Sequence, residues 1–385
     1  MSVSESKYNW KEMRERKAFL ALEDGTIFRG YSVGAAVDKE GEVVFNTGLS
    51  GYQEIISDPS YAGQFVTMTY PEIGNTGINE ADMESASLFL NGFILHSMNT
   101  PSNWRSEQSL TELFIKKSVP AIAGIDTRAL TTKLRESGAM KGYLCCTGNC
   151  SEADAVAKAK EWEGLVDQDY ASKVSCREPY SWDPSGDLSR SWGISEELPP
   201  AKYNIIAYDF GIKWNILRSL RINEMNVKVV PAKTPAAELL KENPDGIFFS
   251  NGPADPAAVS YAIENAKELI GKVPIMGICL GHQILSMACG AERFKLKFGH
   301  HGCNHPVMRL EDKRVEITSQ NHNFGIDFES VPECLEVTHI NLNDQTVEGV
   351  RHKTAPMFAV QYHPESSPGP HDPYYLFEEF KQMMK

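Results

Sequence analysis

The second half of the chain alternates short apolar runs with amphipathic segments. The apolar runs are continuous, as in YNIIAYDF and DGIFFSNGP, which is typical of strands that helices cover on both faces. The segments between them have apolar residues at helical spacing, and the connections are short. From residue 203 onward this pattern predicts an α/β fold with an open, mostly parallel sheet and helices on both faces. Further strand-like runs and a last amphipathic helix complete the chain.

The first half has a different pattern, which predicts a mixed β/α domain over residues 18–163. Two apolar runs flank turn residues 23–26 and indicate a β-hairpin, after which more short strands follow. Three helices are predicted from amphipathic spacing and capping residues. Ser109 and Glu112 have the spacing of a capping box, and Asp126 is a predicted N-cap.

Residues 164–202 lose this periodicity and are rich in Pro, Ser, Gly and Trp. Their aromatic residues need burial, so we interpret them as an ordered linker, with the domain boundary near residue 195. Residues 1–17 are expected to form a short arm, and residues 203–385 the second domain.

Composition narrows the class of protein. The 385 residues carry a net charge of −13, which argues against binding to nucleic acid or to an anionic membrane. No apolar run approaches the length of a membrane span, and the first residues resemble neither a secretory signal nor a transit peptide. The eight cysteines are irregularly spaced, unlike a disulfide framework. We therefore expect a protein of the reducing cytoplasm.

The candidate nucleophile is Cys279, in the motif GICLGHQ. This motif joins a predicted buried strand to a predicted helix, and the glycines at positions −2 and +2 allow a tight turn. At the start of a helix, the dipole and the free N–H groups lower a thiol pKa and can also hold an oxyanion. A buried structural cysteine is the simpler alternative, which the glycines and the strand-to-helix context disfavour.

A thiolate nucleophile needs a base and a group that orients the base. His363 and Glu365 end the apolar run MFAVQYHPE, and residues i and i+2 of an extended chain face the same side. His363 would take the thiol proton and return it to the leaving group, and Glu365 would hold the ring.

These motifs together resemble the class I, triad-type glutamine amidotransferases, which have a flavodoxin-like fold. The resemblance extends from residue 18 to the C-terminus, and segments such as DPSYAG, AIAGIDTRALTTKLRESGA, AYDFGIKWNILR and KFGHHGCNHPV are similar to the small-chain family of carbamoyl phosphate synthetases. The N-terminal domain is the part that other amidotransferases lack. The resemblance implies hydrolysis of glutamine to glutamate and ammonia, and passage of the ammonia to a large synthetase subunit for pyrimidine and arginine synthesis.

The same resemblance implies a glutamine pocket, with the backbone amides of Gly252 and Leu280 as the oxyanion hole. The pocket positions carried over by motif are Ser60, Gly252, Ala254, Leu280, Gln283, Asn321, Asn323 and Phe324. Two of them depart from the family pattern, because Ala254 and Asn323 stand where the family has glycine. At a position with positive φ, Asn is tolerated far better than Ala.

We expect no metal site and no cofactor in this chain. His300, His301, His305 and Cys303 cluster in GHHGCNHP, but their spacing fits no common zinc site, and the resemblance makes this stretch a structured loop. No phosphate-binding loop or dinucleotide motif is visible. The ATP- and Mg-dependent steps are therefore assigned to the partner subunit.

Two other functions remain open. The first is an amidotransferase for another synthesis, such as that of anthranilate or guanylate, which the N-terminal motifs disfavour. The second is a structural or regulatory subunit with a decayed glutamine site, which Ala254 and Asn323 motivate.

Overall fold

The chain folds as two compact units. The computed structural model describes residues 10–190, 197–253 and 255–385. The N-terminal unit comprises the residues up to Ser57 together with Gly63–Met83 and Ser87–Gly164. The C-terminal unit comprises Leu165–Lys385 and two short segments from the first half of the chain, Asp58–Ala62 and Glu84–Ala86. Part of the predicted arm, and the predicted boundary near residue 195, lie outside the described residues.

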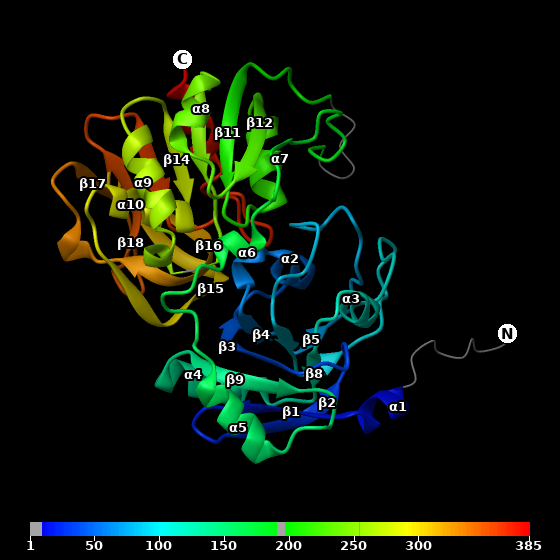
Figure 1. Cartoon of the computed structure of the whole chain (residues 1–385). Coiled ribbons are helices and arrows are strands. Elements are labelled where there is room, and N and C mark those ends of the chain that lie inside the picture. The colour runs from blue at the N-terminus through cyan, green and yellow to red at the C-terminus, as the bar shows by residue number, and fades with distance from the viewer. Residues whose placement is uncertain (1–9, 191–196, 254) are drawn as a thin grey trace. The chain divides into compact units, whose positions relative to one another are not determined.

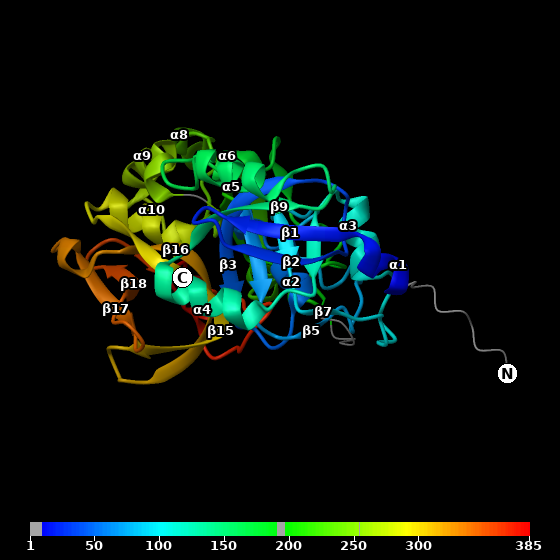
Figure 2. The same ribbon diagram turned by 90° about the horizontal axis from the view of Figure 1, so that it is seen from below.

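The core of the N-terminal unit is a closed barrel with both parallel and antiparallel strand pairs (Figure 2). The predicted hairpin is confirmed, because the first two strands pair in antiparallel fashion with Leu20 opposite Phe28. Closure of the sheet was not predicted. The barrel strands, in spatial order, are β1 (Lys17–Leu22), β2 (Ile27–Ser32), β8 (Ala121–Ala123), β6 (Gly92–Ile94), β4 (Gln64–Met68), β3 (Lys39–Asn46) and β9 (Met140–Cys145), and β5 (Glu72–Ile73) pairs separately with β7 (Ser97–Met98).

Helix starts in this unit follow their capping residues. Ser109 and Glu112 form the predicted capping box, and the Asp126 side chain accepts a hydrogen bond from the N–H of Ala129 (2.9 Å). Two short helices, α1 and α2, were missed by the sequence analysis. The helices are α1 (Trp10–Glu15), α2 (Tyr52–Ser57), α3 (Leu110–Lys116), α4 (Thr127–Ser137) and α5 (Glu152–Glu161).

The C-terminal unit is built on one large mixed sheet (Figure 1). The prediction of a mostly parallel sheet is wrong for half of it. The strands from β12 to β19 in spatial order pair in parallel, and those beyond β19 pair in antiparallel fashion because short turns, not crossover helices, connect them. The spatial order is β10 (Tyr180–Ser181), β12 (Met225–Pro231), β11 (Tyr203–Asp209), β13 (Gly246–Phe249), β14 (Ile275–Ile278), β19 (Met357–Val360), β18 (Val347–His352), β17 (Leu335–Asn341), β15 (Arg293–Arg309) and β16 (Val315–Ile326).

Helices cover both faces of the parallel half, as predicted. Alternate residues of a strand point to opposite faces, so Ile205 packs in one apolar cluster and Ile206 in another. The Ile205 cluster includes α7 (Trp214–Ile222) and α11 (Tyr375–Gln382). The Ile206 cluster includes α8 (Ala236–Lys241), α9 (Ser260–Leu269), α10 (Leu280–Ala288) and α6 (Ala171–Val174). Trp182 of the predicted linker is also buried, with its indole N–H on Ser189 Oγ (3.0 Å).

The histidine-rich stretch is a strand, so the prediction of a loop there is wrong. It lies in the middle of β15 and pairs with β16, with His301 opposite Asn321. The register shifts between Lys295 and His300 and again between Gly302 and His305, and these bulges accommodate the glycines within a continuous strand. Within the described ranges, no helix combines the length and the apolar character that crossing a bilayer requires.

Candidate active site

Cys279 stands on the sharp turn between β14 and α10. Its backbone has φ 55° and ψ −106°, a conformation that a non-glycine residue adopts only when the surroundings enforce it. A hydrogen bond from its N–H to the Val360 carbonyl (2.9 Å) holds it to β19. The turn also needs Gly281, because a Cβ there would lie 2.1 Å from the Phe249 carbonyl oxygen. The predicted strand–turn–helix context of Cys279 is thus present.

The thiol of Cys279 is buried beside the first amides of α10. Cys279 is the N-cap of this helix, so the Leu280 N–H belongs to the first turn, whose N–H groups have no partner within the helix. The next amide, that of Gly281, donates to the Ser250 carbonyl (3.0 Å). Sγ of Cys279 lies 3.5 Å from the Asn321 carbonyl oxygen, and the residue is 2% exposed. A small carbonyl substrate would meet a thiol and an N–H donor at this point.

His363 and Glu365 lie next to one another as predicted, but on a turn. β19 ends at Val360, and the bond from the Ser366 N–H to the His363 carbonyl (3.1 Å) closes the turn that follows. The expectation of an extended strand is therefore wrong, whereas the expected pair is formed: His363 Nδ1 lies 2.7 Å from Glu365 Oε1. The opposite ring nitrogen, Nε2, is buried without a hydrogen bond of ordinary length.

Charge around the ring favours its protonated form. Burial would lower the pKa of His363, but Glu365 and the nearby Cys279 together raise this pKa to about 10. Burial would likewise raise the pKa of Glu365, and the cations Lys213 and His363 lower it to about 2. An ionised carboxylate therefore orients an imidazole that readily holds the proton of the thiol.

Lys213 is a member of this site that the sequence analysis missed. Its Nζ lies 2.9 Å from Glu365 Oε1 and 2.5 Å from the Ser366 carbonyl, and its side chain is 3% exposed. Burial would lower the pKa of Lys213, but Glu365 and Glu84 raise it well above its usual value. The only signal in the sequence was its place in AYDFGIK, at the end of a strand of the parallel half.

The segment Asp58–Ala62 brings Ser60 into the C-terminal unit. Asn251 donates from Nδ2 to Ser60 Oγ (2.8 Å), and Asp58 Oδ1 accepts from the Ser60 N–H (2.8 Å). Asp58 Oδ2 accepts from Asn321 Nδ2 (2.7 Å). The structure thus joins Ser60 and Asn321, two predicted pocket residues, through Asp58, and Asn251 holds the Ser60 hydroxyl. Neither Asp58 nor Asn251 was predicted.

Asn323 has a defined partner in His301. Asn321 donates from Nδ2 to Asp58, so its Oδ1 faces His301 Nδ1 (3.0 Å) and accepts the ring proton. Burial lowers the pKa of His301 to about 4, which leaves the ring neutral and Nε2 an acceptor. The nearest atom of Asn323 is Oδ1, 3.0 Å from Nε2, and the side chain donates to this nitrogen once a flip of the amide exchanges its oxygen and nitrogen. Asn323 lies in extended conformation within β16, where an asparagine is not strained.

The other predicted pocket residues lie around the same turn. Gln283 donates from Nε2 to the Phe324 carbonyl (2.7 Å) and to Gln361 Oε1 (3.0 Å), so it also fixes the β16 backbone. At Gly252 a Cβ would lie 2.1 Å from the Phe210 carbonyl oxygen, which explains a glycine there. Ala254 lies outside the described residues.

His300 and His322, two buried histidines of this unit, are held by hydrogen bonds and ion pairs. His300, His322 and Glu348 offer ligand atoms within 4.8 Å of one another. Burial would lower the pKa of His300, but Asp344 and Glu348 raise it to about 9, and a protonated ring has no lone pair for a metal ion. His322 Nδ1 faces the Phe324 carbonyl oxygen (2.7 Å) and therefore carries its proton there.

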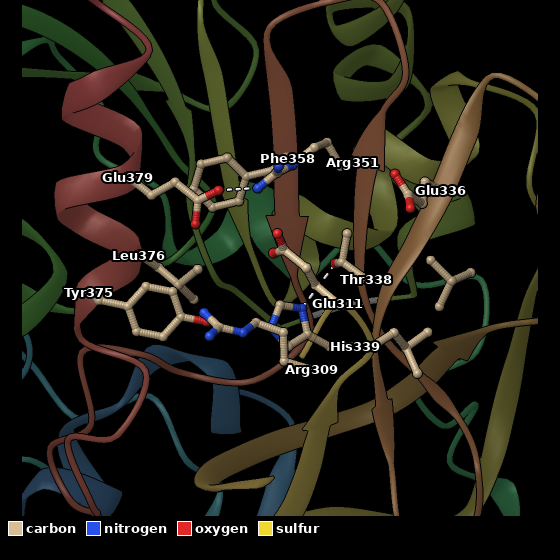
Figure 3. A pocket seen from close by; sticks show the side chains of 12 residues that line it. Arg309, Glu311, Glu336, Thr338, His339, Arg351, Phe358, Tyr375, Leu376 and Glu379 are labelled. Atoms are coloured by element: carbon tan, nitrogen blue, oxygen red, sulfur yellow. Dashed lines mark hydrogen bonds and ion pairs between the residues drawn. The ribbon is translucent and has the colours of Figure 1, made fainter. Parts of the chain in front are cut away.

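A cavity of about 590 Å³ lies elsewhere in this unit, between α11 and strands β17, β18 and β19 (Figure 3). Its two arginines are paired: Arg351 with Glu379 and Arg309 with Asp312. No residue of the proposed triad lines it. We therefore do not assign the glutamine chemistry to this cavity.

Each half of the chain matches a known protein family. The family description "Glutamine amidotransferase class-I" matches residues 206–383, and "Carbamoyl-phosphate synthase small chain, CPSase domain" matches residues 20–144. The chain is 51% identical to the carbamoyl phosphate synthase small chain of Rhodopirellula baltica, covering 96% of each protein. It is 50% identical to that of Aquifex aeolicus, covering 96% of this chain and 99% of the relative.

A plant relative and a solved structure extend the comparison. The chloroplastic small chain of Oryza sativa is 49% identical, covering 96% of this chain and 82% of the relative. Among solved structures, a glutamine amidotransferase from Thermotoga maritima is similar to 42% of this chain and 76% of its own, with a TM-score of 0.35 and 17% identity. By its full-length sequence similarity and both of its domains, the chain belongs to the carbamoyl phosphate synthase small chain family.

Proposed function

We propose that this chain hydrolyses glutamine with Cys279, His363 and Glu365 and supplies the ammonia to a carbamoyl phosphate synthase. The observation that carries the proposal is the strained turn that holds Cys279 at the start of α10, with the His363–Glu365 pair beside it. The family of the chain supplies the substrate and the product.

The reaction would begin with the thiol proton on His363, a state that the ring's raised pKa favours. The Cys279 thiolate attacks the side-chain amide carbon of glutamine, and the amides of Gly252 and Leu280 stabilise the oxyanion. The intermediate collapses as His363 protonates the leaving nitrogen, which releases ammonia and leaves a glutamyl thioester. His363 then takes a proton from water, the hydroxide attacks the thioester, and glutamate leaves with the thiolate restored.

The glutamine pocket is proposed from the family motif and from the network around it. Ser60, Gln283 and the β16 segment with Asn321, Asn323 and Phe324 would hold the substrate. Several of these side chains are already engaged with Asp58, Asn251 or His301, so their orientation is fixed before glutamine arrives. Such preorganisation lowers the cost of binding.

The partner would be the large synthase subunit, which combines the ammonia with bicarbonate at the expense of ATP. A Mg²⁺-dependent ATP site is assigned to that subunit, because the sequence of this chain has no phosphate-binding loop. The complex would work in the cytoplasm. A purely structural or regulatory role is not favoured, since all three groups of the triad are present.

The test is glutamate release by the purified chain, alone and with its large partner, bicarbonate and ATP. We expect weak release alone and a strong rise in the complex. Cys279→Ser should abolish glutamine-dependent synthesis and leave synthesis from added ammonia unchanged. Full glutaminase activity in Cys279→Ser would refute the proposal.

A further inference from the structure

Two cysteines and a histidine meet at the far end of the nucleophile helix. Cys289 is the C-cap of α10, Cys334 lies just before β17, and His352 is the last residue of β18. One ligand atom of each lies within 4.8 Å of the other two. All three residues are partly exposed, and the cysteines are unpaired thiols that pack against the same apolar cluster.

Three such side chains could suggest a zinc site, but the histidine argues against one. His352 Nδ1 accepts hydrogen bonds from the backbone N–H groups of Ala355 (2.9 Å) and Thr354 (3.2 Å). A neutral ring whose Nδ1 is an acceptor carries its proton on Nε2. Neither nitrogen then has a free lone pair for a metal ion, which leaves a pair of neighbouring thiols beside a fixed imidazole.

We propose that Cys289 and Cys334 are a modification site, a dithiol that thiol–disulfide exchange converts reversibly into a disulfide. With glutathione disulfide as the oxidant, the Cys334 thiolate attacks one of its sulfurs, forming a mixed disulfide and releasing one glutathione thiolate. Cys289 then loses its proton to solvent and attacks the Cys334 sulfur, which releases the second glutathione. Two protein thiols are oxidised, and one glutathione disulfide is reduced to two thiols.

The order of attack follows from the surroundings of Cys289. Burial and the neighbouring Cys334 raise the pKa of the Cys289 thiol to about 12, so it is the weaker nucleophile while Cys334 is reduced. Once Cys334 is in a mixed disulfide it carries no charge, so its contribution to the raised pKa of Cys289 disappears.

The disulfide would act on the helix that carries the catalytic cysteine without touching the reaction itself. α10 begins after Cys279 and has Cys289 as its C-cap, about 15 Å from Cys279 at the helical rise. The bond would fasten the C-terminal end of this helix to the entry of β17. Its formation can thus be measured independently of glutamine hydrolysis.

The experiment is exchange of the full-length chain with glutathione disulfide, followed by alkylation, denaturation and non-reducing peptide mapping. Molecules that carry a glutathione adduct are identified by mass and left out of the count. In the remaining molecules the number of free thiols should fall from eight to six. One pair of peptides should be joined through Cys289 and Cys334. Dithiothreitol should restore eight. Cys289→Ser and Cys334→Ser should each lose the joined pair, whereas the control Cys150→Ser, at a partly exposed thiol of the N-terminal unit, should keep it.

Two results would overturn the proposal. One is the absence of the joined peptide under conditions that oxidise other thiols of the chain, whether Cys289 and Cys334 are each glutathionylated separately or do not react at all. The other is that the reduced chain retains one equivalent of Zn²⁺ and that Cys289→Ser, Cys334→Ser and His352→Gln each abolish this binding. That result would make the cluster a metal site.

Discussion

Lys213 Nζ lies 2.9 Å from Glu365 Oε1, the same oxygen that faces His363 Nδ1 at 2.7 Å. One carboxylate oxygen thus receives a fixed cation on one side and the His363 imidazole on the other. All three groups are almost wholly buried, so their charges are little screened by solvent. The ammonium keeps Glu365 ionised, and the ionised carboxylate raises the pKa of His363.

Lys213→Gln should therefore damage both stability and catalysis. The substitution removes the cation that balances the buried Glu365 carboxylate, and breaking a buried ion pair in this way lowers the free energy of unfolding by about 3 to 5 kcal/mol. We expect a lower melting temperature and a kcat for glutamate release about 10 to 100-fold below wild type, because Glu365 would then tend to hold a proton in place of His363. Thermal unfolding and steady-state kinetics measure the two effects.

Lys228→Gln is the matched control for this change. Lys228 pairs with Glu242 at 2.7 Å, but both side chains are exposed, and such pairs contribute about 1 kcal/mol or less. Kinetics close to wild type are expected for this variant. Equal behaviour of the two variants would mean that the buried ammonium has no special role.

Glu365→Gln tests whether the carboxylate sets the protonation of the triad. Without its charge, burial dominates and the pKa of His363 falls from about 10. The imidazolium that balances a Cys279 thiolate becomes less stable, so alkylation of Cys279 by iodoacetamide at pH 7 should slow and its pH profile should move to higher pH. Glutamate release should drop by roughly 100-fold or more. An unchanged alkylation profile would contradict this account.

Features set by nearby residues were predicted well from the sequence. The hairpin around residues 23–26, the Ser109–Glu112 capping box and the turn that carries Cys279 each depend on a few adjacent residues, and each is present. The alternation of strands and helices in the second half also held, because its periodicity is repeated along many residues.

Features set by contacts between distant residues were not predicted. Lys213 and Glu365 are far apart in the chain, and nothing in the sequence around either indicates the pair. The antiparallel half of the large sheet depends on which strands become neighbours in the fold. Strand β15 continues through GHHGCNHP by means of bulges, whereas the glycines of this stretch favour a loop in the sequence pattern. The packing of Asp58 against Asn321 likewise becomes visible only in the folded chain.

Gly281→Ala should prevent the turn that carries Cys279 from forming. A Cβ at this position would lie 2.1 Å from the Phe249 carbonyl oxygen, which is backbone and cannot rotate away. Moving α10 to relieve the clash would cost roughly 1 to 3 kcal/mol or more and would lengthen the bond from the Gly281 N–H to Ser250. We expect a lower melting temperature and little glutamate release. Gly325→Ala is the control for stability, since its Cβ would meet only the Phe294 ring at 3.3 Å, which is partly exposed and can shift.

The stability of the C-terminal unit should depend on pH through His300. Burial would lower the pKa of this ring, but hydrogen bonds and charge from Asp344 and Glu348 raise it to about 9 from the usual 6.5. A raised pKa in the folded state means that the contribution is fully present below pH 6.5 and is lost as the pH rises toward 9. It amounts to at most about 3 kcal/mol. Urea unfolding at pH 6.5, 7.5 and 9 should therefore show a decline in the free energy of unfolding that is shallower in His300→Gln than in wild type.

His305→Gln is the control, because burial lowers the pKa of His305 to about 4 and its ring is neutral across this range in the folded state. Equal slopes for wild type and His300→Gln would show that the ring is already neutral at pH 6.5 and that Asp344 and Glu348 do not hold a proton on it.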